Sequence, residues 1–434
     1  MFRPTGFADL GARRVGIFGY GVEGRAAVAR LVGTCELVVV DDAEDVAPGV
    51  LVTSRGGFEA LLSCDVVLKS PGIPRRRADV LELEAAGVTV TSALNLWLHE
   101  CDLTHVVAVT GTKGKSTTTA LIAFFLECLG QRAHRVGNIG RPPYDPSLDA
   151  REGWLVLEVS SFQAVDLDVA PAMVVVTSLG ADHVDWHGSV EQYRSDKLSL
   201  TRADGEHVTL VADTAALRAV EDQLGGDLRF VAPDDDHVAV ALGLIGVHND
   251  SNVALALAAV ATLTGVGERE VRVAVLEDAS RFTPLRGRLT LVGSEDVVGG
   301  VIRYVDDGLA TSVLPAIAAL DVFGDDAVAL IAGGFDRGID YGPLAEVIAA
   351  RGASTTVITM GNAGVRLSDE VRARRPELGQ HVATTMPEAV EIARTSLTRG
   401  GVVLLSPAAP SFDRYHNWEE RSDDFVSIVL DLLR

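Results

Sequence analysis

The chain has 434 residues, 47% of them hydrophobic, and a formal net charge of −22 from 38 basic and 60 acidic residues. This length exceeds one ordinary core, so two or three domains are expected, and the hydrophobic content excludes a disordered chain. The excess of acidic residues argues against nucleic acid or an anionic membrane as a partner, although small anions can still bind to backbone amides and lysines.

Four cysteines, Cys35, Cys64, Cys101 and Cys128, lie singly along the chain. Without a paired spacing or neighbouring histidines, they predict reduced thiols and not disulfides or a zinc site. The N-terminal segment lacks a signal-peptide core, and no apolar run reaches about 18 residues. We therefore expect a cytoplasmic protein without a membrane anchor.

The first hundred residues alternate short apolar runs with helical patterns. Residues 13–33 predict a strand, a glycine turn and a helix, and residues 35–42 and 64–72 add two strands. This alternation is typical of a Rossmann-like parallel sheet.

Gly19, Gly21 and Gly24 form the pattern G-x-G-x-x-G directly after the first predicted strand. Glycines permit a tight turn, and the helix N-terminus that follows attracts a diphosphate. Asp41 ends the next strand, where a dinucleotide enzyme places its ribose-binding carboxylate. By itself, this segment fits an NAD-dependent oxidoreductase, a site for another nucleotide diphosphate, or a glycine turn needed only for packing.

Residues 104–130 predict a second strand, loop and helix, with the loop T-G-T-K-G-K-S-T. Gly111 and Gly114 allow backbone N–H groups to converge on phosphate oxygens, Lys115 can reach the terminal phosphates, and the Ser116 hydroxyl can bind Mg²⁺. The loop is shorter than the usual phosphate-binding loop, since only three residues separate Gly111 from Lys115. The pattern predicts an ATP site.

The rest of the chain continues the α/β alternation. A turn-rich patch at residues 280–293 indicates a domain boundary. The predicted strands on either side of that patch are 154–161, 172–180, 207–213, 228–233, 301–307, 327–334, 355–361 and 401–409, with a helix at 251–265 among those between them.

Several polar residues follow these strands. Glu158 ends a predicted strand near the phosphate loop, where Mg²⁺ needs an oxygen ligand, although a glutamate at the edge of the core is the alternative. Asp182, His183, Asp185 and His187 could ligate a metal, but their spacing matches no tetrahedral zinc signature, and ordinary loop residues are the alternative. Downstream, Lys197 fits a solvated helix lysine, and Asn249 and Asn252 fit helix caps.

Taken in order, the motifs resemble the Mur ligase family. They are G-T-K-G-K-S-T, L-E-V-S-S-F-Q, D-H-V-D-W-H-G-S, a lysine about ten residues on, H-N-D-S-N and G-G-F-D-R-G-I-D, and the ending L-L-S-P-A-A-P-S-F-D-R-Y-H-N-W-E-E-R-S-D-D-F is similar to that of the glutamate-adding branch. The resemblance covers essentially the whole chain. It implies an α/β protein of three domains: a Rossmann-like domain for the UDP of the substrate (1–100), a central P-loop ATPase-type domain (101–285), and a Rossmann-like glutamate-binding domain (286–434).

The implied reaction is ATP-dependent joining of glutamate to UDP-N-acetylmuramoyl-L-alanine in peptidoglycan precursor synthesis. The substrate carboxylate attacks the γ-phosphate, and the glutamate amine then displaces phosphate from the acyl phosphate. We expect a monomer. A folylpolyglutamate-type ligase is an alternative, but it is not expected to keep the N-terminal domain. An oxidoreductase or a non-enzymatic nucleotide-binding module leaves several of the motifs unexplained.

The resemblance also implies roles for individual residues. Lys115 is expected to bind the β- and γ-phosphates, Ser116 and Glu158 the first Mg²⁺, and His183 the second, beside a carbamylated Lys197. The other expected ATP-binding residues are Gly111, Thr112, Lys113, Gly114, Thr117, Asn252, Arg288 and Asp307. The expected UDP-substrate residues are Gly21, Val22, Glu23, Asp41, Ser70, Pro71, Gly72, Asn138, Ser160 and Ser161. The expected glutamate-binding residues are Thr311, Arg337, Ser411 and Trp418.

Three positions depart from the family pattern. Lys113 replaces the usual asparagine of the phosphate loop, Leu309 replaces a lysine, and Arg337 replaces another lysine of the amino-acid pocket. Because a forked guanidinium cannot hold a carboxylate where an ammonium would, the glutamate is expected to be seated differently. These changes favour addition of L-glutamate, with D-glutamate as the alternative.

Overall fold

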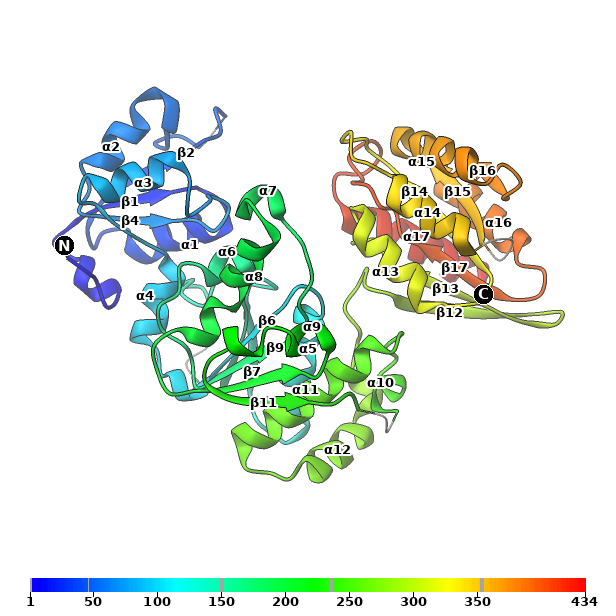
Figure 1. Ribbon diagram of the computed structural model, residues 1–434, viewed down its shortest axis with the longest axis horizontal. Coiled ribbons are helices and arrows are strands. Elements are labelled where there is room, and N and C mark those ends of the chain that lie inside the picture. Colours follow the sequence, from blue (N-terminus) through cyan, green and yellow to red (C-terminus); the bar gives the residue numbers. More distant parts are fainter. Residues whose placement is uncertain (1, 46, 149–151, 235–236, 352–354) are drawn as a thin grey trace. The chain divides into compact units, whose positions relative to one another are not determined.

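The apolar runs of the first hundred residues form one parallel sheet in the computed structural model (Figure 1), which describes residues 2–45, 47–148, 152–234, 237–351 and 355–434. The chain separates into two compact units. One consists of Met1–Asp236 and Asp250–Asp278, and the other of His237–Asn249 and Ala279–Arg434. The first unit therefore contains two sheets, and the second unit contains a third.

The N-terminal sheet has the strand order β3-β2-β1-β4-β5, with β1 at its centre. The chain runs from β1 through β2 to β3 on one side and then crosses to β4 on the other side of β1, so the strand order reverses at β1. Ligands of doubly wound sheets bind at such a switch point. The predicted Rossmann-like architecture is confirmed here. The elements are β1 (Arg14–Phe18), α1 (Val22–Leu31), β2 (Glu36–Asp41), β3 (Leu51–Val52), α2 (Phe58–Leu62), β4 (Val66–Lys69), α3 (Ala78–Ala85), β5 (Thr89–Thr91) and α4 (Ala93–Glu100).

The central sheet has the order β11-β10-β9-β6-β8-β7, and all its strand pairs are parallel. Every residue of β6 is buried, as are ten of the fourteen residues of α5, so the loop that joins them rests on a rigid core. The strands are β6 (Val106–Thr110), β7 (Ala133–Gly137), β8 (Trp154–Glu158), β9 (Met173–Val176), β10 (Val208–Ala212) and β11 (Asp227–Val231). The helices are α5 (Lys115–Cys128), α6 (Ser161–Ala164), α7 (Val184–His187), α8 (Val190–Leu198), α9 (Ala215–Arg218), α11 (His248–Thr264) and α12 (Glu268–Glu277).

The sheet of the second unit has the order β12-β13-β17-β14-β15-β16, in which only β12 and β13 pair antiparallel among the described residues. Along β14, Val328 and Leu330 pack with α13–α15, whereas Ala329 and Ile331 pack with α16 and α17, so both faces are buried. The elements are α10 (Val238–Ala241), β12 (Thr290–Val297), β13 (Gly300–Asp306), α13 (Val313–Val322), β14 (Val328–Gly333), α14 (Gly342–Arg351), β15 (Thr355–Met360), α15 (Gly361–Arg374), β16 (Gln380–Val382), α16 (Met386–Ser396), β17 (Gly401–Leu405) and α17 (Trp418–Leu432).

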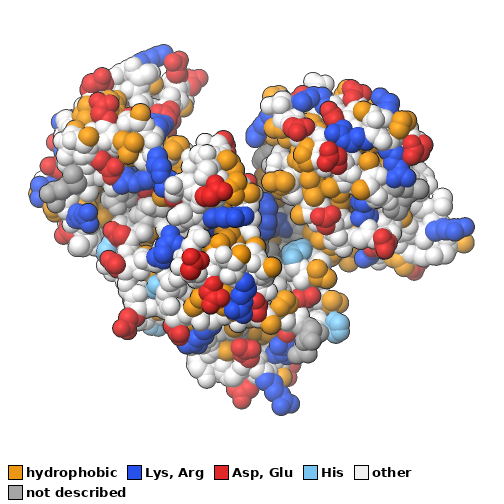
Figure 2. Space-filling view, in the orientation of Figure 1, with side chains coloured by type: hydrophobic (Ala, Val, Ile, Leu, Met, Phe, Trp, Pro, Cys, Tyr) orange, Lys and Arg blue, Asp and Glu red, His pale blue; other side chains and the backbone are white. Residues whose placement is uncertain are grey.

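On the face shown in Figure 2, basic and acidic side chains are interspersed on both units. Among the described residues, no single helix is long and apolar enough to cross a membrane. The pair α11 and α12 meets the length and composition criteria only when joined, and it is bent by 115°.

Candidate active site

The phosphate loop leaves the carboxyl end of β6 and enters α5. Gly111 has φ 141° and Gly114 has φ 86°, conformations that side chains disfavour, so glycine is required at both positions. A Cβ at Gly114 would also lie 2.5 Å from Asn252 Oδ1, and Thr118 Oγ1 donates to the same oxygen at 3.1 Å. Asn252 therefore braces the loop, and its predicted role in binding ATP stays a prediction.

Two lysines converge on one carbonyl of this loop. Lys115 Nζ and Lys197 Nζ each donate to the Gly111 oxygen at 2.9 Å. Lys197 is only 2% exposed, and burial, assisted by the charges of Lys115 and Lys113, lowers its pKa well below the usual lysine value. The interpretation of Lys197 as a solvated surface lysine is therefore wrong, since the side chain is buried beside the loop.

Glu158 supplies an uncompensated carboxylate beside the same loop. Its side chain is buried, and Oε1 accepts a hydrogen bond from Asn138 Nδ2 at 2.6 Å. Oε2 is buried without a hydrogen-bond partner among the described residues. A buried carboxylate oxygen that lacks a partner is a fitting ligand for Mg²⁺, which prefers oxygen donors. Among the described residues, no group of three or more His, Cys, Asp and Glu side chains forms a metal cluster by itself.

Lys113, the residue that departs from the family pattern, is half-exposed and lies 3.5 Å from the Asp182 carboxylate. Its own backbone N–H donates to Ser178 Oγ at 2.8 Å, which ties the loop to the segment after β9. Thr112 is held by Tyr193, whose hydroxyl lies 2.9 Å from Thr112 Oγ1. The phosphate loop is thus fixed on both sides before any ligand binds.

The four polar residues after β9 have different environments. His183 is exposed, with φ 47°, and its ring lies 4.8 Å from that of Phe162. His187 is buried, with Nδ1 2.7 Å from Asp196 Oδ2 and Nε2 3.0 Å from Ser161 Oγ. The family resemblance assigned a role to His183 and none to His187, and the sequence did not indicate Asp196.

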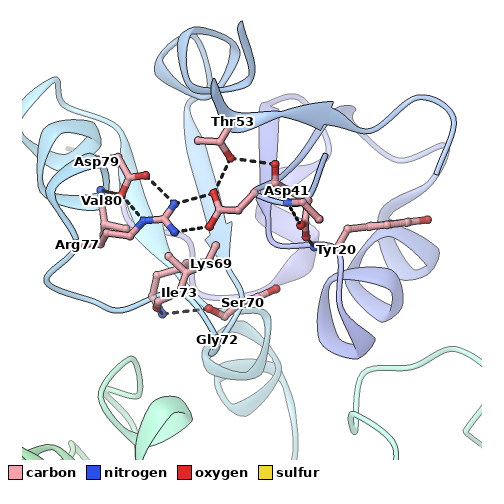
Figure 3. Close-up of polar contacts among 12 residues, drawn as sticks. Tyr20, Asp41, Thr53, Lys69, Ser70, Gly72, Ile73, Arg77, Asp79 and Val80 are labelled. Carbon is pink, nitrogen blue, oxygen red and sulfur yellow. Dashed lines mark hydrogen bonds and ion pairs between the residues drawn. The ribbon is translucent and has the colours of Figure 1, made fainter. Parts of the chain in front are cut away.

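In the glycine pattern after β1, one glycine is needed for packing, and another borders unfilled space. A Cβ at Gly24 would collide with the Gly19 carbonyl, so this glycine permits close contact between helix and strand, whereas a Cβ at Gly21 would meet nothing. Asp41 accepts from the Tyr20 N–H at 2.6 Å (Figure 3). Ser70 Oγ donates to the Gly19 oxygen at 2.7 Å. Asp41 therefore already stabilises the loop, and its predicted role toward the UDP substrate stays a prediction.

The carboxylate of Glu23 lies between the two sheets of the first unit. Its oxygens accept from Gln163 Nε2 at 2.6 Å and from the Tyr144 hydroxyl at 3.1 Å. Burial raises the pKa of Glu23. Nearby, Lys69 and Asp166 form a buried ion pair at 2.7 Å that the sequence did not indicate. These contacts fix the N-terminal sheet against the central sheet.

The other predicted UDP-substrate residues follow the carboxyl ends of strands in these two sheets. Val22 is 60% exposed at the first turn of α1, Gly72 offers its carbonyl to Trp186 Nε1 at 3.3 Å, and Ser160 caps α6. Pro71 and Ser161 lie at the carboxyl ends of β4 and β8, respectively.

In the second unit, β13 ends at Asp306, and a second aspartate, Asp307, follows it directly. Asp307 accepts from Ser406 Oγ at 2.8 Å, and burial raises its pKa to about 7, partly offset by that hydrogen bond and by Arg288. Asp306 accepts from Ser422 Oγ at 3.0 Å. A side chain at Gly308 would collide with the Ser422 hydroxyl, so Ser422 explains the glycine at this position.

The predicted glutamate-binding residues are spread around the same sheet edge. Arg337 is exposed and lies 5.8 Å from the ring of Phe412, next to the buried Ser411. Trp418 packs against Gly287, where a Cβ would lie 2.5 Å from its ring. Thr311 follows Asp307 in the same loop. The structure brings Arg337 next to the Ser411 loop through Phe412.

The phosphate loop between β6 and α5 of a parallel sheet defines a nucleotide-dependent enzyme of the Mur ligase type. The model of the Mur ligase middle domain matches residues 109–223. A Micromonospora relative named UDP-N-acetylmuramoyl-L-alanine--L-glutamate ligase is 37% identical over 98% of this chain and 98% of its own length. A relative of the same name from Xanthomonas euvesicatoria pv. vesicatoria is 34% identical over 97% of this chain and 96% of its own. The chain therefore belongs to the Mur ligase family.

Solved structures support the fold. MurF ligase from Thermotoga maritima in complex with ADP matches with TM-score 0.55 and 15% identity, over 99% of this chain and 97% of that one. UDP-N-acetylmuramate-alanine ligase MurC from Thermotoga maritima matches with TM-score 0.54 and 18% identity, over 97% and 100%.

Proposed function

We propose that this protein is an ATP-dependent ligase that joins L-glutamate to UDP-N-acetylmuramoyl-L-alanine for peptidoglycan synthesis. The observation that carries this proposal is the convergence of Lys115, Lys197 and the uncompensated Glu158 carboxylate around the phosphate loop. The names of the relatives support the choice of substrates.

In the proposed reaction, the alanyl carboxylate attacks the γ-phosphorus of ATP and ADP leaves. The amine of glutamate then attacks the acyl carbon, and phosphate leaves as the amide forms. Lys115 and the N–H groups of the loop bind and neutralise the phosphates, and the buried surroundings exclude water that would hydrolyse the acyl phosphate.

We assign two Mg²⁺ sites to this chain. Ser116 and Glu158 would hold the first ion, and His183 with a carbamylated Lys197 the second. Bound Mg²⁺ neutralises phosphate charge and orients the phosphoryl group. Carbamylation needs a neutral amine, and the buried environment of Lys197 supports that form. The modification would convert a buried cation into a carboxylate.

The remaining assignments complete this proposal. The segment 1–100 is assigned to the UDP substrate, 101–285 to ATP, and 286–434 to glutamate. Arg288 and Asp307 are proposed to hold phosphate and ribose, and Arg337 to bind a carboxylate of glutamate. We further propose that the protein acts as a monomer in the cytoplasm.

The test is phosphate release from ATP by the purified chain, with each substrate omitted in turn and with D- and L-glutamate supplied separately. The expected result is release that requires both UDP-N-acetylmuramoyl-L-alanine and L-glutamate. Inactivity with both enantiomers would contradict the ligase assignment, and a clear preference for D-glutamate would contradict the assigned stereochemistry.

A further inference from the structure

A chain of polar contacts leads from the loop after β4 to the buried floor of the candidate site. Both terminal nitrogens of Arg76 lie 2.8 Å from the carboxylate oxygens of Asp196 on α8. The same carboxylate lies 2.7 Å from His187 Nδ1, and His187 Nε2 lies 3.0 Å from Ser161 Oγ. Asp196, His187 and Ser161 are buried, whereas the side chain of Arg76 is 48% exposed.

The direction of these hydrogen bonds follows from their chemistry. An ionised carboxylate can only accept, so His187 donates to Asp196 from Nδ1. Burial lowers the pKa of His187, and the neutral ring has one N–H, so Nε2 accepts the hydroxyl hydrogen of Ser161. Each side chain of this network orients the next one. Removal of one side chain therefore leaves its partner buried without a hydrogen bond and free to change orientation.

Asp196 is also the immediate neighbour of Lys197. On α8, the Asp196 side chain points to Arg76, and the Lys197 side chain points to the Gly111 carbonyl of the phosphate loop. The ion pair therefore fixes the rotation of the helix that delivers the Lys197 amine. The loop after β4 also contacts the preceding helix α7, because Trp186 Nε1 donates to the Gly72 carbonyl at 3.3 Å.

A purely structural clamp between the two sheets already exists elsewhere. Lys69 and Asp166 form an ion pair whose side chains are 0% and 2% exposed, and Glu23 is held by Gln163 and Tyr144. A half-exposed arginine adds little stability to such a junction. Its two hydrogen bonds to one carboxylate instead provide orientation.

We propose that Arg76 is a positioning residue of the ligase reaction, which through Asp196 holds the Lys197 amine and the Ser161 hydroxyl in their reactive arrangement. The inference rests on the proposed function. It also assigns Asp196 and His187 to the same unit, so the loop beside Ser70–Gly72 and the phosphate loop are coupled through one side-chain network.

The test compares Arg76→Ala with Arg77→Ala. Arg77 is the next residue in the same loop, and its partners Asp42, which follows β2, and Asp79, on α3, both belong to the N-terminal hundred residues, so it is a matched control. We expect Arg76→Ala to lower kcat about 10- to 100-fold, with the KM for ATP within about twofold, because misplacement by about 1 Å costs this much. Arg77→Ala should keep the wild-type kcat.

Chemical rescue adds a readout that loss of folding would not reproduce. Guanidinium at millimolar, non-denaturing concentration should restore part of the kcat of Arg76→Ala, whereas the same concentration of NaCl should not. A kcat of Arg76→Ala equal to that of Arg77→Ala would overturn the positioning role, and so would restoration by NaCl.

NMR of the full-length protein labelled with ¹⁵N-histidine observes the hydrogen-bond network directly, independently of enzyme activity. The His187 Nδ1–H resonance, assigned with His187→Gln, should lie at low field in the wild type and in Arg77→Ala, and shift in Arg76→Ala. An unchanged resonance in Arg76→Ala overturns the inference. A wild-type chain that shows the low-field resonance but no ligase activity overturns the proposed function, and with it the positioning role of Arg76 in the reaction, while the hydrogen-bond network stands.

Discussion

The phosphate-loop region and the predicted glutamate-binding region differ in how firmly their charged groups are held. Around the loop, Lys197 and Glu158 are each 2% exposed, and protein atoms contact both side chains. In the second unit, Arg337 is exposed and rests on Phe412, which is itself 58% exposed. The first region is therefore preorganised, and the second is open to solvent.

This difference in burial matches the two proposed functions, phosphoryl transfer at the phosphate loop and recognition of glutamate in the second unit. Phosphoryl transfer depends on fixed charges in a dry environment, where electrostatic stabilisation is strongest. Recognition of a free amino acid needs only complementary groups that order when it binds. We therefore expect substitutions near the loop to lower kcat, and substitutions near Arg337 to raise the KM for glutamate.

The largest effect is expected at Lys197. Lys197→Ala should lower kcat about 100- to 1,000-fold, because it removes a fixed group at the centre of charge development. Short carboxylates such as formate should restore part of this activity if the lysine acts as a carbamate. Lys197→Arg is the matched variant, since a guanidinium stays protonated and cannot add CO₂. Substantial activity of Lys197→Arg in phosphate release would contradict the carbamate.

Glu158→Gln tests the preorganised region with a change of charge but little change of shape. We expect kcat to fall about 100-fold and the Mg²⁺ concentration for half-maximal activity to rise, because a neutral amide replaces an anionic carboxylate ligand. Asn138→Ala should have a smaller effect, since it removes only the donor to Oε1. An unchanged Mg²⁺ titration of Glu158→Gln would exclude this residue as a ligand.

Arg337→Lys tests the open region. The KM for L-glutamate should rise about tenfold, because one ammonium replaces a forked donor at a carboxylate. The kcat and the KM for ATP should stay near the wild-type values in steady-state assays. A change confined to the KM for ATP would show that Arg337 serves the nucleotide instead.

The smallest effect is a pH dependence of stability at Asp307, whose pKa burial raises from 3.8 to about 7. The folded chain therefore holds a proton between about pH 4 and 7 that the unfolded chain releases. This residue lowers the free energy of unfolding as pH rises through that window, by at most about 1.4 kcal/mol per unit.

Asp307→Asn should remove this contribution. Urea unfolding of the wild type and the variant at pH 5 and pH 8 measures the difference, and the other buried carboxyl groups cancel in the comparison. Equal pH dependence of the two proteins would contradict the raised pKa.

Much of the fold could be predicted because its signals are local. Buried parallel strands appear as continuous apolar runs, as in β6 and β14, and glycines mark the loops between strands and helices. β12 was not predicted as a strand, because it is a half-exposed edge strand whose pairing with β13 is decided by the hairpin. β7 was also missed, since it has few apolar residues and lies at a sheet edge.

The sequence by itself determined the position of the phosphate loop, the position of Glu158 at the end of a strand, and membership of the Mur ligase family. These depend on short motifs with fixed spacing. Only the tertiary structure decided which polar residues meet. Arg76 and Asp196 are 120 positions apart, and Gly308 is explained only by Ser422 from a distant helix. The physical reason is burial: whether Lys197 is a solvated cation or a neutral amine depends on the atoms packed around it, which no local pattern specifies.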